Sequence, residues 1–77
     1  MSAPLAQWKP ESVKAGEWAT FDFNALGSSA RITGTDAPSS TYAGAGTVRR
    51  NFKTPGTVEW TITNSEGSTT ATLTVTA

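Results

Sequence analysis

The residue types that most often carry out catalysis or bind metal ions are scarce in this 77-residue chain. It contains no histidine and no cysteine, so the commonest general base, the thiol nucleophile and the thiolate metal ligand are all absent. No serine stands in the sequence context of a nucleophile elbow. Among the acidic residues, Asp22, Asp36, Glu59 and Glu66 fall in different predicted strands and loops. We therefore expect a non-enzymatic protein; a hydrolase would need these carboxylates to converge in one pocket.

Two loops have part of the composition of ligand-binding loops but not their spacing. The segment "GTDAPSS" at 34–40 offers one carboxylate and some hydroxyls, whereas a calcium loop brings several oxygen ligands together. The segment "YAGAGT" at 42–47 lacks the lysine and the helix that follow the glycines of a phosphate-binding loop. Six basic residues balance six acidic ones, so no net charge favours nucleic acid or a membrane surface. We expect no cofactor or metal, and neither nucleic acid nor membrane as a partner.

Three aromatic residues and one arginine remain as candidates for binding a partner. Trp18 has the opposite parity to its apolar neighbours, Trp8 lies near the N-terminus, and Tyr42 lies in a segment rich in glycine and serine. Exposed tryptophan and tyrosine are enriched at the energetic centres of interfaces. Alternatively, the two tryptophans cover each other or close the end of the core, and Tyr42 anchors its loop. Arg49 is predicted to point away from the core, where it either contacts a partner or is solvated.

Short β-strands are the elements that must position these residues, because apolar and polar residues alternate with period two. Turn sequences separate the runs, including "KAGE" at 14–17, "TPG" at 54–56 and the hairpin "NSEG" at 64–67. Each run has one apolar face, and a second sheet is needed to keep that face out of water. The sequence therefore predicts one all-β domain over residues 1–77, a two-sheet sandwich of six to seven strands. The strands are expected at about residues 5–8, 17–25, 29–33, 47–52, 57–63 and 70–77.

From Thr70 onward every second residue is threonine. The residues between them, including Leu73 and Val75, are predicted to point into the core and Ala77 to follow them. Ice-binding threonine arrays need a flat, regular surface, which a twisted sandwich does not supply. We therefore interpret the threonines as the solvated face of a sheet.

Two stretches of the chain resemble the immunoglobulin-like sandwiches of bacteria and phages, most of all the polycystic-kidney-disease (PKD) type. They are "AGEWATFDF" at 15–23 and "FKTPGTVEWTITNSEGSTTATLTV" at 52–75, whereas "ARITGTDAP" at 30–38 replaces the W-D-F-G-D-G strand of that family. The resemblance implies an immunoglobulin-like, antiparallel two-sheet β-sandwich. The matching residues are Gly16, Thr20, Phe21, Asp22, Phe52, Pro55, Gly56, Asn64 to Gly67, Leu73 and Val75.

The resemblance and the residues together predict a structural or binding module that presents a surface to another macromolecule. In the first context it is a phage virion protein, made in the host cytoplasm, that decorates the capsid or tail and binds a capsid or tail protein. A natural start at Met1 and the lack of a secretory signal favour this context. In the second context it is a spacer or accessory domain of a secreted, extracellular bacterial enzyme or adhesin.

The two contexts place the binding residues differently. A virion protein is expected to dock through an extended N-terminal segment, residues 1–10, with Leu5, Trp8 and Lys9 in contact. The face of Trp18 completes that docking patch. In the secreted context, Trp18 and Tyr42 are expected to bind carbohydrate. A bacterial surface glycan is a further candidate partner.

Overall fold

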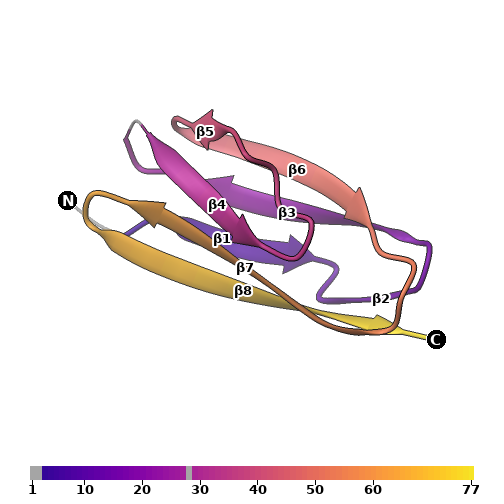
Figure 1. Cartoon of the computed structure of the whole chain (residues 1–77). Coiled ribbons are helices and arrows are strands. Elements are labelled where there is room, and N and C mark those ends of the chain that lie inside the picture. The colour runs from indigo at the N-terminus through magenta and orange to yellow at the C-terminus, as the bar shows by residue number, and fades with distance from the viewer. Residues whose placement is uncertain (1–2, 28) are drawn as a thin grey trace.

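A computed structural model of the chain describes residues 3–27 and 29–77. The described residues form eight β-strands and no helix (Figure 1). Accordingly, they include no helix that is long and apolar enough to span a membrane. The strands are β1 (Leu5–Lys9), β2 (Ser12–Lys14), β3 (Trp18–Asn24), β4 (Ala30–Gly34), β5 (Thr41–Tyr42), β6 (Ala45–Asn51), β7 (Gly56–Asn64) and β8 (Gly67–Thr76).

The strands form two sheets with the orders β1-β3-β6 and β2-β8-β7-β4-β5. The all-β architecture of two sheets around a shared core, predicted from the alternation, is confirmed. The described residues contain eight strands, whereas six to seven were predicted. β2 and β5 were not among the expected strands, because three and two residues are too few to show an alternation. Pairing is antiparallel except between β2 and β8, which are parallel, so the prediction of a wholly antiparallel sandwich is wrong for this pair.

The N-terminal segment belongs to the sandwich and crosses from one sheet to the other. β1 pairs along its whole length with β3, from Leu5 opposite Asn24 to Lys9 opposite Thr20. Pro10, which follows a cis peptide bond, interrupts this pairing because proline has no N–H to donate. β2 then joins the other sheet. Residues 3–10 of the predicted extended docking segment are therefore built into the domain, and residues 1–2 lie outside the described part of the chain.

One buried cluster fills the space between the sheets. The inward parity predicted for β3, β4, β7 and β8 is confirmed, since the side chains that were predicted to point inward within these strands are buried. Ala77 is the exception: it lies beyond the end of β8 and is exposed. The core residues are Trp8, Val13, Ala19, Phe21, Phe23, Ala25, Ala30, Ile32, Phe52, Val58, Trp60, Ile62, Ala71, Leu73 and Val75.

The β7–β8 hairpin is the most extensive strand pair, running from Gly56 opposite Val75 to Asn64 opposite Gly67. The Asn64 side-chain oxygen accepts hydrogen bonds from the backbone N–H groups of Glu66 and Gly67, at 2.7 and 3.1 Å. Gly67 has φ of +153°, a conformation that side chains with a Cβ rarely adopt. The hairpin predicted at "NSEG" is therefore confirmed, with Asn64 and Gly67 as its closing pair.

Candidate binding face

The outward side chains of β1, β3 and β6 form one continuous surface, which we call the three-strand face. The strand register places them in four cross-strand rows, because alternate residues of a strand point to the same side of its sheet. Four of the six residues proposed from the sequence as partner contacts belong to this face. The rows are Leu5, Asn24 and Ala45; Gln7, Asp22 and Thr47; Lys9, Thr20 and Arg49; and Trp18 with Asn51.

Trp18 and Arg49 form the most distinctive contact on the three-strand face. The Trp18 side chain is 56% exposed. The Arg49 guanidinium lies 5.2 Å from the centre of its ring, within cation–π range. The arginine covers part of one face of the indole. The pair therefore presents an exposed aromatic ring beside a positive charge.

Lys9 on β1 and Asp22 on β3 form an ion pair on the three-strand face. The Lys9 ammonium lies 3.2 Å from the Asp22 carboxylate, and both groups are substantially exposed. Such surface ion pairs stabilise a fold by less than about 1 kcal/mol. Asp22 was not proposed as a contact from the sequence, although its parity with Trp18 shows that it shares the outward side. Since Asp22 neutralises Lys9, Arg49 carries the remaining positive charge of the face.

Leu5 is the apolar end of the three-strand face, with 59% of its side chain exposed. It borders a shallow hollow of about 510 Å³. Leu5 and Trp18 lie on neighbouring strands at opposite ends of the sheet, since Leu5 pairs with the last residue of β3 and Trp18 is its first. The face thus has an apolar group at each end and the Lys9, Asp22 and Arg49 charges between.

Trp8 does not belong to this surface, and its prediction as an accessible docking residue is wrong. Its side chain is only 2% exposed, and its indole Nε1 donates a hydrogen bond of 3.3 Å to the carbonyl of Ala71. The indole lies at 5.1 Å from Phe21 and 4.8 Å from Trp60, measured between ring centres. The alternative that Trp8 and Trp18 cover each other is wrong too, because Trp8 points inward and Trp18 outward.

Tyr42 lies on the other sheet, away from Trp18. It is half-buried, and its ring packs edge-on against Phe23 at 5.1 Å. Phe23 follows Trp18 by five residues on β3, a separation of about 17 Å along an extended strand. The loop-anchoring alternative describes Tyr42 better than the ligand-contact prediction, because its ring helps to close the core. Trp18 and Tyr42 do not form a shared platform for a sugar ring.

Arg50 has inward parity, which is unusual for a charged residue. Its guanidinium lies 5.8 Å from the centre of the Trp60 ring and donates hydrogen bonds to the carbonyls of Asp36 and Arg49, at 3.2 and 3.1 Å. Arg50 therefore contacts two backbone carbonyls and the Trp60 ring. They connect β6 to the loop that follows β4.

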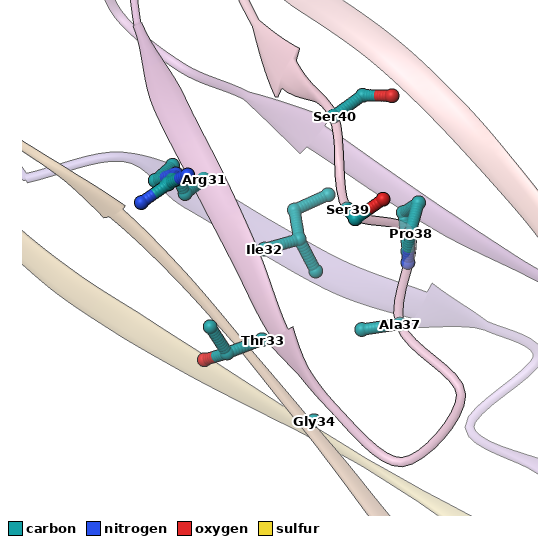
Figure 2. A pocket seen from close by; sticks show the side chains of 8 residues that line it. All are labelled: Arg31, Ile32, Thr33, Gly34, Ala37, Pro38, Ser39 and Ser40. Atoms are coloured by element: carbon teal, nitrogen blue, oxygen red, sulfur yellow. The ribbon is translucent and has the colours of Figure 1, made fainter.

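A second hollow lies between β4 and that loop, as Figure 2 shows. It has a volume of about 380 Å³ and is lined by residues 31–34 and 37–40. It contains no carboxylate, and the hollows beside Leu5 and Pro55 contain one each, Asp22 and Asp36. Within residues 3–27 and 29–77, no three carboxylates lie close enough to hold a metal ion.

The outer face of the five-stranded sheet carries the threonines. Thr61 and Thr70 sit opposite each other with their hydroxyl oxygens 2.8 Å apart, and Thr63 and Ser68 form the same contact at 2.8 Å. These hydroxyls satisfy one another across strands, which is ordinary sheet stabilisation. The side chains between them on β8, such as Leu73, are buried.

Replacing both Thr61 and Thr70 by valine is expected to change the free energy of unfolding by less than about 1 kcal/mol, because both hydrogen-bonding partners are removed together from an exposed site. Urea unfolding followed by circular dichroism measures the effect. A loss above about 2 kcal/mol would show that the hydroxyl pair stabilises the sheet far more than an exposed bond should.

No protein-family model, curated protein or solved structure was found to match this chain.

Proposed function

We propose that the protein is a non-enzymatic binding module that docks onto another macromolecule through the three-strand face. The observation that carries this proposal is the exposed Trp18 with Arg49 stacked on it. Tryptophan and arginine are the residues most enriched at the energetic centres of interfaces. Their neighbours Lys9 and Asp22 supply a polar surround, and Leu5 a second apolar contact.

The strand order supports an immunoglobulin-like assignment within this proposal. In immunoglobulin-like sandwiches the first, second and fifth strands share one sheet, and the third, sixth and seventh share the other. The same relation holds here if β1, β3 and β6 are taken as the first group and β4, β7 and β8 as the second. The short strands β2 and β5 extend the second group at its two edges.

The separation of the carboxylates supports the non-enzymatic part of the proposal. General acid–base hydrolysis uses two acidic side chains that face the same bond. The three hollows described above contain at most one carboxylate each. The chain also has no histidine or cysteine to act as base or nucleophile.

We further propose a phage virion as the setting, with a capsid or tail protein as the partner. The support is the resemblance of residues 15–23 and 52–75 to phage and bacterial immunoglobulin-like domains, together with the balanced charge of the chain. The alternative setting is an accessory or spacer domain of a secreted bacterial protein. Its glycan-binding form has less support because Trp18 and Tyr42 lie apart.

Co-sedimentation with particles of the phage that encodes the protein tests the docking face and the setting together. Trp18→Ala is expected to weaken binding by tenfold or more, which corresponds to about 1.4 kcal/mol, while leaving the fold intact because the side chain is exposed. Thr72→Ala, on the outer face of the other sheet, is the matched control and is expected to bind like the wild type.

The possible outcomes separate the parts of the proposal. Equal binding by Trp18→Ala and the wild-type protein would overturn the three-strand face as the docking surface. If the wild-type protein does not sediment with the particles, the virion setting fails. Tryptophan fluorescence titrated with chitin and cellulose oligomers then tests the glycan alternative, which predicts a shift that Trp18→Ala abolishes.

A further inference from the structure

β6, seven residues long, lies at the edge of its sheet and presents the backbone groups of every second residue on its free side. Among these groups, the Arg49 carbonyl accepts a hydrogen bond from the Arg50 guanidinium. β3 pairs with β6 on one side, from Trp18 opposite Asn51 to Asn24 opposite Ala45. Within the described part of the chain, no strand pairs with β6 on its other side. A strand edge carries backbone N–H and C=O groups that an additional strand can pair with. β6 is therefore a place where an extended segment of another protein fits the sheet.

The side chains along β6 show that this edge is open towards the core. Val48 points inward, opposite Phe21, yet it is only half-buried, whereas Phe21 on the central strand is fully buried. Gly46 has no side chain, and the Phe23 ring fills the space beside it, 3.0 Å from where a Cβ would lie. Arg50 and the carbonyl of Asp36 close the opening one step further along. An added strand would complete the cover of Val48 with an apolar side chain of its own.

β6 itself carries two positive charges and no negative one, although the protein as a whole is neutral. Two acidic residues lie close by: Asp22, opposite Thr47 on β3 and ion-paired with Lys9, and Asp36, whose carbonyl bonds Arg50. The sequence has no acidic residue between Asp36 and Glu59, and in the same interval it has Arg49, Arg50 and Lys53. The only ion pair within the described residues joins two groups outside this interval. Charge complementarity therefore favours an acidic occupant of the β6 edge.

The charges of β6 disfavour a second copy of the chain as the occupant of this edge. Antiparallel pairing of β6 with β6 of another copy would bring two arginines from each copy onto one strand pair. Charged residues on edge strands protect proteins from such self-association. Of these two arginines, Arg49 is exposed and can pair with a carboxylate, whereas Arg50 points inward and bonds two carbonyls.

We propose that the free edge of β6 takes up an extended, acidic segment of the partner protein as a fourth strand of this sheet. In that segment, acidic residues alternate with apolar ones. The acidic side chains lie on the outer side, where one pairs with Arg49, and the apolar side chains lie on the inner side against Val48. This inference rests on the proposed function, because Arg49 belongs to both the three-strand face and the β6 edge.

A synthetic peptide tests the proposal without knowledge of the natural partner. The probe is a nine-residue peptide of alternating glutamate and valine, acetylated and amidated at its ends. Its control has the same composition with the glutamates and valines in separate blocks. Amide hydrogen exchange and nitrogen-15 NMR spectra of the protein are recorded with each peptide. The alternating peptide is expected to slow exchange at every second amide of β6 by about tenfold or more, and the block peptide to leave these amides unchanged.

Two matched charge reversals test the role of Arg49. Arg49→Glu is expected to weaken peptide binding about fivefold or more, since a favourable cross-strand charge pair becomes a repulsive one. Arg31→Glu changes an exposed arginine on the other sheet and is expected to leave binding unchanged. Circular dichroism spectra of both variants confirm that each is folded.

Each outcome decides the proposal. Protection of alternate β6 amides by the alternating peptide alone supports strand addition. Peptide-induced shifts at Trp18 without protection of β6 overturn it, and so does the absence of binding. In both of these cases the co-sedimentation experiment still decides whether the three-strand face binds the particle, so the proposed function stands or fails separately.

Discussion

Replacing Trp8 by alanine is expected to leave the protein largely unfolded at room temperature. Truncating a buried tryptophan typically costs about 3–5 kcal/mol. Trp8 is 2% exposed, packs against Phe21, Phe52 and Trp60, and donates its indole N–H to the carbonyl of Ala71. A disulfide-free domain of this size has a total stability of only a few kcal/mol. The loss therefore approaches the whole free energy of unfolding, which urea titration followed by circular dichroism measures.

Two further tryptophan variants make this prediction specific. Trp18→Ala is expected to change the free energy of unfolding by less than about 1 kcal/mol, because its ring is already exposed to water. Trp8→Phe is expected to remain folded but less stable than the wild type, since it keeps an aromatic ring and loses the indole N–H. Equal stability of Trp8→Ala and Trp18→Ala would contradict the placement of Trp8 in the core.

Gly34→Ala is expected to destabilise the protein by about 2 kcal/mol more than Gly27→Ala. Both glycines have φ of +142°, so both substitutions share the cost of a side chain in that conformation. A Cβ on Gly34 would overlap the carbonyl oxygen of Glu59 and lie 2.8 Å from Cδ1 of Trp60. A Cβ on Gly27 would meet no atom within 4 Å. The difference is therefore the cost of overpacking, about 1–3 kcal/mol.

The position of Gly34 explains why the clash cannot relax easily. Gly34 pairs with Trp60 across β4 and β7, and the Trp60 indole donates a 2.7 Å hydrogen bond to the carbonyl of Thr35. Relief of the clash requires the two strands to separate or this bond to break. The two glycine variants are compared by urea unfolding under identical conditions. Equal loss of stability in both would contradict the close approach of β4 to Trp60.

The alternation of side chains predicted the core well where a strand is long. On β7 and β8, with nine and ten residues, the buried side chains are the ones that the period-two pattern places inward. The same pattern showed that Trp18 points outward from β3. Trp8 was instead judged by its place near the N-terminus. β1 does alternate, with Ala6 and Trp8 inward, but its five residues include an exposed apolar Leu5, so their composition does not show which side faces the core. The inward position of Trp8 follows from its pairing with Phe21, which is a contact between strands.

Contacts between strands also decide which candidate residues lie together. The sequence placed Lys9, Trp18 and Arg49 on separate strands but could not show that these strands are neighbours. Their meeting on one surface depends on the order β1-β3-β6. The separation of Tyr42 from Trp18 depends equally on β5 joining the other sheet. The parallel pairing of β2 was not predictable either, because three residues are too few to show a period.

The most direct test of the three-strand face is oxidative footprinting of the protein, free and bound to the phage particle that is proposed as its setting. Hydroxyl radicals modify exposed tryptophan rings, and Trp18 is exposed, whereas Trp8 and Trp60 are buried. Leu26, exposed in the loop after β3, serves as the internal control. Docking through the three-strand face is expected to lower the oxidation rate of Trp18 about fivefold or more, because the partner covers its ring. The oxidation rate of Leu26 is expected to change little. An unchanged Trp18 oxidation rate in the bound protein would show that the three-strand face is not the docking surface.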